Sequence, residues 1–353
     1  MTTESLRATN SREPSSSAAL LEVEDLQKYY PITSGVLRRL VGHVRAVDGV
    51  DLTLAPGETL GLVGESGCGK STLARTLIRL LEPTGGQIRF RGQAVTHITG
   101  AELRRFRRHI QMVFQDPYSS LNPRLSARQS IAEPMRIHHL HDRGGERNRV
   151  DELLERVGIP LTDADRLSGQ FSGGQRQRIA IARALALEPD LLVLDEPVAA
   201  LDVSTQAQIM NLLRDLQRDL GVAYLFISHD LAVVRQIAHR VAVMYLGKVV
   251  ETGAASDIYQ RASHPYVQAL LSAVPISDPA LRGRRQRIIL RGDVPNPAAP
   301  PSGCRFRTRC WKAQDICAAE VPALVERGTG HPVACFFAST STDLEGSETF
   351  SKA

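Results

Sequence analysis

Short apolar runs alternate with helical stretches along most of this chain. A β-rich apolar run at 58–64, "ETLGLVG", ends at glycine and is followed by "KSTLARTLIRLLEP", a pattern typical of a helix that stops before Pro83. Two later runs, "LLVLDEP" and "VAYLFISHD", are continuously apolar, as strands are when both faces of a parallel sheet are covered. Each is again followed by a helical stretch, so the pattern predicts a doubly wound α/β domain.

The pattern changes in the middle of the chain. Between Asp116 and Phe171 the β signals fade and helical stretches such as "RVDELLERVGI" dominate. This predicts a helical subdomain at 116–171, inserted into an α/β core made of residues 19–115 and 172–260. Near the end of that core, "RVAVMYLGKVVETG" predicts a hairpin that turns at Leu246-Gly247-Lys248.

Both ends of the chain differ from the core. After about residue 260, Pro-rich segments such as "VPNPAAPPSG" predict a separate C-terminal appendage at 261–337. Residues 1–18 are rich in Ser and Thr and lack aromatic side chains, so they bury too little to order themselves. We expect flexible tails at 1–18 and 338–353.

Composition narrows the class of protein. The 353 residues are 42% hydrophobic and 23% charged, as in a soluble globular protein. No apolar run approaches the roughly 18 to 20 residues that span a bilayer, and the N-terminus lacks a signal-peptide core, so the expected compartment is the cytoplasm. The net charge of +5 is too small to indicate a nucleic-acid partner, and "ELRRFRRH" fits a solvated helix face.

The segment "GESGCGKS" fits the phosphate-binding pattern G-x-x-x-x-G-K-[ST] between a strand and a helix. Its glycines let backbone N–H groups turn toward phosphates, Lys70 reaches the terminal phosphates, and Ser71 can ligate Mg²⁺. Cys68 is interpreted as a small tolerated residue without a redox task. The predicted nucleotide-binding residues of this loop are Gly64, Glu65, Ser66, Gly67, Cys68, Gly69, Lys70, Ser71 and Thr72.

Two acidic residues end the strand "LLVLDEP". Open α/β sheets bind ligands at the carboxyl ends of their strands, so this pair is expected beside the phosphate loop. Asp195 can hold Mg²⁺ through water, and Glu196 can orient and deprotonate an attacking water. A solvated pair is the plain alternative, and the upstream phosphate loop favours the functional interpretation.

A second helix N-terminus is predicted at "FSGGQRQRIAIARALALEP". Ser172, Gly173 and Gly174 open this helix and, with Gln175, present its free N–H groups and positive dipole end to a phosphate. A serine cap alone explains Ser172 but not the Gly-Gly-Gln that follows. Because one nucleotide has no evident need of two helix N-termini, we infer that this segment serves a partner subunit.

Together these motifs resemble an ABC-type ATPase subunit. The phosphate loop, "FSGGQ", "LDEP", Gln115 in "VFQDP" and His229 in "FISHD" occur in the order and spacing of that family over residues 20–260. The resemblance implies a P-loop NTPase (RecA-like) core with an inserted helical subdomain and, here, a small Cys-containing C-terminal appendage. It also implies a pair of domains that sandwiches two ATP molecules, each between the P-loop of one domain and the signature segment "FSGGQ" of the other.

The resemblance also implies roles for single residues. Tyr30 would stack on the adenine ring, with Tyr29 as the alternative in the other register. Gln115 would contact Mg²⁺ and the attacking water and link the site to a partner, and His229 would contact the γ-phosphate.

Two positions depart from the family pattern. Phe171 replaces a leucine at the start of the signature segment, and Ala199 stands where a serine is usual. The serine hydroxyl that Ala199 lacks would lie near the interface of the ATPase pair, so its absence concerns communication between the two ATP sites. It does not affect the presence of Glu196.

Three further stretches resemble the importer ATPases of the oligopeptide/dipeptide/nickel group: "FQDPYSSLNPR", "HPYVQALLSAVP" and "VPNPAAPPSGCRFRTRC". This resemblance implies a peripheral ATPase on the cytoplasmic face of the inner (plasma) membrane. Its implied partners are an identical or related ATPase subunit, two transmembrane permeases docked on the helical subdomain, and an extracytoplasmic peptide-binding protein, with no nucleic acid. Which peptide or nickel complex is carried stays open.

A rival interpretation is a soluble ABC ATPase that acts on nucleic acid or ribosomes. The feature that can be cited for it is a cluster of four arginines: Arg104, Arg105, Arg107 and Arg108. Such proteins usually carry a long coiled coil or tandem ATPase cores, and the sequence has neither.

Four of the five cysteines lie in the C-terminal appendage, at Cys304, Cys310, Cys317 and Cys335. Their spacing lacks the C-x-x-C pair of zinc ribbons, and disulfides are disfavoured in a reducing compartment. Four thiolates suit Zn²⁺ or an iron–sulfur cluster equally on chemistry, and the resemblance to the peptide-importer group implies a [4Fe-4S] cluster. Small buried apolar side chains are the plain alternative, and a metal or redox sensor is a third possibility.

Overall fold

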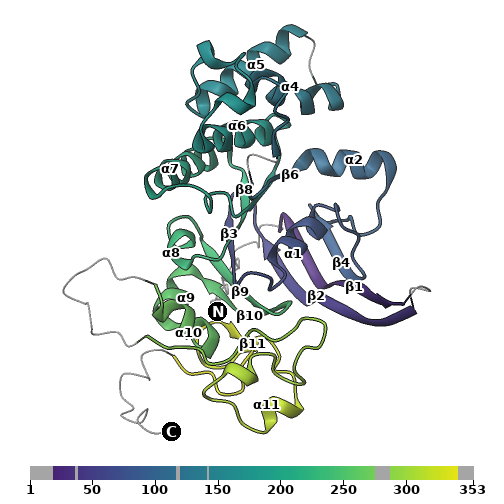
Figure 1. The fold of residues 1–353 in the computed structure, drawn as a ribbon, viewed down its shortest axis with the longest axis vertical. Coiled ribbons are helices and arrows are strands. Elements are labelled where there is room, and N and C mark those ends of the chain that lie inside the picture. Colours follow the sequence, from purple (N-terminus) through teal and green to yellow (C-terminus); the bar gives the residue numbers. More distant parts are fainter. Residues whose placement is uncertain (1–18, 36–38, 117–119, 141–142, 275–286, 341–353) are drawn as a thin grey trace, which may run out of the picture.

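The structure is a computed structural model that describes residues 19–35, 39–116, 120–140, 143–274 and 287–340 (Figure 1). The tail expected at 1–18 lies outside the described residues, as does the tail expected at 338–353 beyond Thr340. No helix in these ranges is long and apolar enough to cross a membrane.

The main sheet joins the core to the C-terminal appendage. Its strand order is β11-β12-β10-β9-β3-β8-β7-β6, and the run from β9 to β6 is parallel. The strands are β3 (Thr59–Val63), β6 (Ile110–Val113), β7 (Leu191–Asp195), β8 (Ala223–Ser228), β9 (Arg240–Tyr245), β10 (Lys248–Ala254), β11 (Val325–Glu326) and β12 (Pro332–Val333). The expected hairpin is present, with Leu246 and Gly247 between β9 and β10.

A second, antiparallel sheet has the order β2-β1-β4-β5 and lies beside the main one (Figure 1). Its strands are β1 (Leu21–Ser34), β2 (Arg39–Leu54), β4 (Gly85–Phe90) and β5 (Gln93–Ala94). The sequence pattern did not predict this long two-stranded ribbon, because β1 and β2 carry polar residues at many positions where the ribbon extends away from the core.

Helices cover both faces of the main sheet, as the continuous apolar strands predicted. In β7, Leu192 and Leu194 face a core shared with the helical subdomain, whereas Leu191 and Val193 face a core shared with the antiparallel sheet. The helices are α1 (Lys70–Leu77), α2 (Gly100–His109), α4 (Ala127–His138), α5 (Arg143–Arg156), α6 (Gly173–Leu185), α7 (Val203–Leu220), α8 (Leu231–Val234), α9 (Ala255–Arg261), α10 (Pro265–Ser272) and α11 (Ile316–Ala319). Short 3₁₀ turns are η1 (Leu161–Asp163), η2 (Ser168–Gln170) and η4 (Arg307–Arg309).

The insert between β6 and α6 is helical, and its helices α4 and α5 pack against α6. Figure 1 shows these three helices as one layer above the sheets. Helix α6 therefore belongs to this layer by packing, although the sequence pattern grouped it with the core.

Two helices end earlier than the pattern predicted. Helix α1 stops at Leu77 rather than before Pro83, because Arg79 has a left-handed backbone (φ 58°) and both Leu80 and Leu81 donate back to the Arg75 carbonyl. Helix α8 covers only Leu231–Val234 of the stretch 230–240. The apolar spacing predicted that one side of each segment is buried, but it did not predict where each helix ends.

The appendage is attached through a buried carboxylate. Glu251 on β10 is fully buried and accepts hydrogen bonds from the backbone N–H groups of Ser263 (2.8 Å) and His264 (2.9 Å). Its Oε1 also lies 2.6 Å from Nε2 of His331, next to β12. These contacts satisfy the carboxylate away from water and fix α10 and β12 against the edge of the main sheet.

Candidate nucleotide site

The P-loop connects β3 to α1 and is tightly packed at its glycines. Gly69 has φ 110°, and a Cβ there would lie 2.0 Å from the Ala46 carbonyl oxygen; a Cβ on Gly64 would lie 2.2 Å from the Met244 carbonyl oxygen. Only glycine fits these two positions. Helix α1 has no side-chain cap, so its first N–H groups have no side-chain acceptor and can serve a phosphate.

Lys70 places a positive charge inside this loop. The side chain is buried, and Nζ donates to the carbonyl oxygens of Gly64 (2.7 Å) and Glu65 (3.0 Å). An ammonium held by two loop carbonyls is positioned for an anion that enters the loop.

Ser71 and Asp195 meet at the start of α1 and the end of β7. The Ser71 hydroxyl donates to Asp195 Oδ1 at 3.0 Å. Burial raises the pKa of Asp195 above its ordinary value, and the hydrogen bond from Ser71 offsets only part of that rise. A hydroxyl beside a carboxylate that is poorly solvated suits a hard divalent cation such as Mg²⁺, so the donor set fits this ion.

Glu196 contacts both of the other predicted catalytic residues, Gln115 and His229. Gln115 Nε2 donates to Glu196 Oε2 at 2.9 Å, and His229 Nδ1 lies 3.3 Å from the same oxygen. The Glu196 side chain is 12% exposed and that of His229 is 52% exposed. Each of these residues follows the carboxyl end of a parallel strand (β6, β7 or β8), and β3 beside β8 leads into the P-loop.

The signature segment begins α6. The Ser172 hydroxyl accepts from the Gln175 N–H (3.3 Å), and Gln175 Oε1 accepts from the Ser172 N–H (3.0 Å), which is a capping box. A Cβ on Gly174 would lie 2.4 Å from Thr205 Cγ2. A serine cap alone does not explain why glutamine and glycine occupy positions 175 and 174. The capping box explains Gln175, and the close approach of Thr205 explains Gly174.

The two tyrosines considered for adenine differ in their surroundings. Tyr29 donates its hydroxyl to Asp48, and burial together with this hydrogen bond raises the pKa of Tyr29 to about 12. Tyr30 is 36% exposed, and Lys28 Nζ lies 5.2 Å from its ring centroid. Tyr30 therefore presents the freer ring face.

The positions that depart from the family pattern are accommodated differently. Phe171 is buried, and the Arg166 guanidinium lies 5.1 Å from its ring centroid, so the larger ring is packed. Ala199 is exposed and donates its N–H to the Glu196 carbonyl at 3.2 Å. Ala199 therefore belongs to the same backbone turn as Glu196.

Comparisons with known proteins decide the family. The family profile "ABC transporter" matches residues 47–199, and "Oligopeptide/dipeptide transporter, C-terminal region" matches residues 250–317. The chain is 53% identical over 317 residues to the oligopeptide transport ATP-binding protein AppF of Bacillus subtilis, and the match covers 90% of this chain and 96% of AppF. The chain belongs to the ABC transporter ATPases. Its C-terminal region places it among those of the oligopeptide/dipeptide transporter type.

Other similar proteins agree with this membership. A probable peptide ABC transporter ATP-binding protein of Sinorhizobium fredii is 53% identical, and the match covers 90% of each chain. Among solved structures, the ATP-binding cassette MJ0796 bound to ADP and Pi has a TM-score of 0.59 and 30% identity, covering 67% of this chain and 98% of its own. The cbiO1 protein of Clostridium perfringens has a TM-score of 0.59 and 30% identity, covering 68% and 90%. The predicted α/β fold of a P-loop ABC ATPase is confirmed, whereas these comparisons do not test the Cys-containing appendage. ATP and Mg²⁺ are the ligands expected of such an ATPase, and the nucleic-acid alternative is not favoured.

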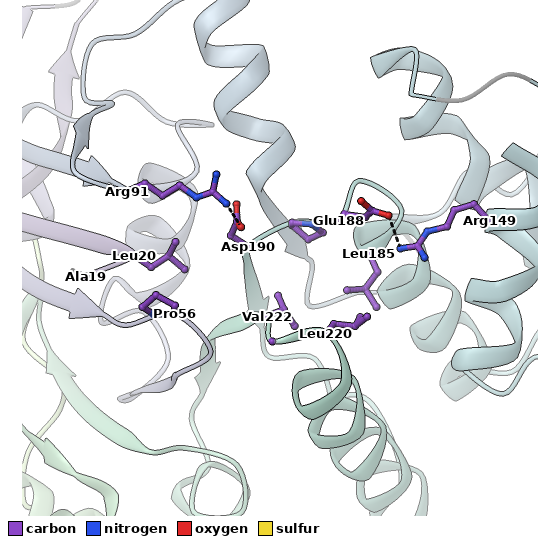
Figure 2. A pocket seen from close by; sticks show the side chains of 12 residues that line it. Ala19, Leu20, Pro56, Arg91, Arg149, Leu185, Glu188, Asp190, Leu220 and Val222 are labelled. Atoms are coloured by element: carbon purple, nitrogen blue, oxygen red, sulfur yellow. Dashed lines mark hydrogen bonds and ion pairs between the residues drawn. The ribbon is translucent and has the colours of Figure 1, made fainter. Parts of the chain in front are cut away.

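A cavity of about 620 Å³ lies away from this site (Figure 2). Arg91 pairs with Asp190 across it, and Arg149 lies 3.4 Å from Glu188 at its other side. The segment Glu188–Asp190 connects α6 to the amino end of β7, so the two ion pairs hold this connection from the antiparallel sheet and from α5. None of the predicted nucleotide-site residues lines the cavity.

The four cysteines of the appendage all line one small cavity of about 10 Å³. Burial raises the pKa of Cys310 to about 12 and that of Cys335 to about 11, so both thiols hold their protons near neutral pH. Within the described residues, no group of three or more His, Cys, Asp or Glu side chains is arranged to hold a metal ion. The predicted iron–sulfur cluster is therefore not supported by this arrangement.

Proposed function

We propose that this chain is the ATP-hydrolysing subunit of an ABC importer for peptides. The proposal for hydrolysis rests on the contacts of Gln115 and His229 with Glu196, at the same edge of the sheet as the P-loop. The oligopeptide/dipeptide transporter region at 250–317 and the peptide-import names of the relatives support the substrate class.

In this proposal each residue has one task. Lys70 and the free N–H groups of α1 bind the phosphates of ATP, and Ser71 with Asp195 holds Mg²⁺. Mg²⁺, when bound, spreads the negative charge of the phosphate oxygens. Glu196 accepts the proton of the attacking water, which requires an ionised carboxylate at the edge of solvent.

Two further residues assist this chemistry. Gln115 holds the Glu196 carboxylate in place and orients the water, and His229 contacts the γ-phosphate. Tyr30 stacks on adenine, supported by its exposed ring.

The assembly around this subunit follows from the same family pattern. We propose that the chain pairs with an identical or related ATPase. In this pair, Ser172–Gln175 of each ATPase contacts the ATP held by the other. Residues 116–171 dock on two permease subunits at the cytoplasmic face of the plasma membrane. A peptide-binding protein on the outer side supplies the complex. The domain boundaries at 19–115, 116–171, 172–260 and 261–337 are part of this proposal, supported by the helical layer at α4 and α5.

The test is transport by the assembled complex. The chain, its second ATPase and two permeases are reconstituted in proteoliposomes with ATP inside, and uptake of labelled dipeptides and longer peptides is measured with the binding protein outside. We expect ATP-dependent uptake and ATPase activity stimulated by the loaded binding protein. ATP hydrolysis without uptake of any peptide would contradict the peptide-importer assignment and leave the ATPase assignment intact.

We further propose that the four appendage cysteines bind a metal centre, with [4Fe-4S] the first choice and Zn²⁺ the alternative. The proposal rests on donor chemistry, since soft thiolate donors suit both centres and all four cysteines line one cavity, although the described side chains are not arranged as a metal site. Either centre requires the thiols to lose their protons, because the thiolate is the metal ligand.

Metal analysis of the full chain, purified without oxygen, tests this second proposal. We expect iron and acid-labile sulfide in equal amounts, lost in Cys310→Ser and retained in Cys68→Ser, which changes the one cysteine outside the appendage. Stoichiometric zinc instead would select the alternative, and protein without bound metal would refute the metal centre.

A further inference from the structure

The P-loop carries an acidic side chain where the site must accept an anion. Glu65 directly follows Gly64 in "GESGCGKS", and its carbonyl oxygen accepts from Lys70 Nζ at 3.0 Å. The phosphates of a nucleotide bring several negative charges to this loop. A carboxylate nearby repels them unless a cation neutralises it, most of all where burial lowers the local dielectric.

A cation from the appendage meets that carboxylate. Arg309 Nη1 lies 2.8 Å from Glu65 Oε2, and Arg309 Nη2 lies 3.2 Å from Glu65 Oε1. This is a two-point pair between a guanidinium and both carboxylate oxygens, the strongest geometry for such a contact. The Arg309 side chain is only 9% exposed and that of Glu65 is 25% exposed, so water screens the pair weakly.

The surroundings of the pair come largely from the same appendage. The Glu65 N–H donates to the Tyr266 hydroxyl at 2.9 Å, and Arg309 Nη1 reaches the Tyr245 hydroxyl at 3.4 Å. The rings of Tyr245, Tyr266 and Phe306 pack together with centroid distances of 4.8 to 5.4 Å. Arg309 ends the turn η4, three residues after Phe306, so this aromatic cluster fixes where its guanidinium lies.

We propose that Arg309 is the counter-ion of Glu65, so that the C-terminal appendage completes the electrostatics of the nucleotide site. Arg309 acts on nucleotide through Glu65 and is therefore a positioning residue. The inference rests on the proposed function as an ATPase. Because both side chains are largely shielded from water, removing the guanidinium leaves an unpaired negative charge on the P-loop, whereas removing the carboxylate leaves an unpaired positive charge beside it.

ATP binding to the full-length chain tests this by titration calorimetry, with phosphate release measured in parallel. We expect Arg309→Gln to raise the Kd for MgATP by about tenfold and to raise KM with little change in kcat. Glu65→Gln should bind ATP at least as tightly as the wild type, because it removes the repelling charge. The double variant should recover most of the affinity that Arg309→Gln loses, and Arg309→Lys should recover part.

Arg307→Gln is the matched control, since it removes the same charge from the same turn and Arg307 contacts Ser302 within the appendage. It should bind ATP like the wild type. The proposal is overturned if Arg309→Gln binds ATP normally, if Arg307→Gln weakens binding equally, or if Glu65→Gln weakens binding and the double variant recovers nothing. If Arg309→Gln fails to fold, Arg309→Lys and Glu65→Gln still give the sign of the effect. A wild-type chain that binds no ATP would instead refute the proposed function.

Discussion

Glu196→Gln should lower the rate of ATP hydrolysis by about 10²- to 10⁴-fold, the usual contribution of a general base. The amide has nearly the shape of the carboxylate, and its oxygen can still accept the hydrogen bond that Gln115 donates at 2.9 Å. It cannot take a proton from water. ATP binding should therefore remain, because Lys70 and the N-terminus of α1 are unchanged.

The measurement pairs phosphate release under saturating MgATP with the Kd for ATP of the same variant. Glu188→Gln is the matched control: its side chain is 63% exposed, pairs with Arg149 and lines the separate cavity of Figure 2. That control should hydrolyse ATP at the wild-type rate. Normal turnover by Glu196→Gln would show that another group accepts the proton.

Local sequence signals explain why Gln115, Glu196 and His229 lie close together. The apolar run of β7 requires burial on both faces, and β7 has its alternate side chains in two different cores. Parallel strands bring their carboxyl ends to one edge, so a glutamine, a carboxylate pair and a histidine at three strand ends had to lie near one another. The contacts at Glu196 are the result.

Contacts between distant segments could not be predicted in the same way. Arg309 and Glu65 are 244 positions apart, and the basic run that contains Arg309 gives no local sign of its partner. The tyrosine of "HPY" likewise reaches the Glu65 amide although its own spacing only indicates a helix start. Neither periodicity nor capping rules specify which surfaces of the appendage and the core meet. The early end of α1 could not be predicted for a similar reason. Arg79, just after the helix, has a left-handed backbone and a buried side chain, and local propensity does not include such tertiary packing.

The cysteine segment shows a different limit. Spacing and composition left open whether the four thiols converge, and in the structure all four line one cavity. Spacing could not predict the size of that cavity, because its walls include residues from α10 and from the segment around Phe336. Donor chemistry left the metal open as well, because four thiolates suit Zn²⁺ and an iron–sulfur cluster equally.

The signature segment leads to the second large expected effect. Ser172→Arg should leave ATP binding by the separate chain intact and lower turnover by about 10²-fold or more, as expected when donors to the transition state are lost. Within its own chain Ser172 caps α6 and contacts Gln175. We propose that in a pair of ATPases it contacts the ATP bound to the other subunit. A bulky arginine there would obstruct the approach of the other ATPase and would also remove a cap worth about 1 kcal/mol.

Two measurements separate obstruction from misfolding. Ala101→Arg is the matched control, because it adds the same side chain at an exposed position in the first turn of another helix, α2. It should keep both binding and turnover. For the wild type, specific activity should rise with protein concentration as pairs form, whereas the low activity of Ser172→Arg should not rise with concentration while its Kd for ATP is unchanged. Turnover by a strictly monomeric wild-type chain would contradict the shared site, because each P-loop would then be complete without a second Ser172.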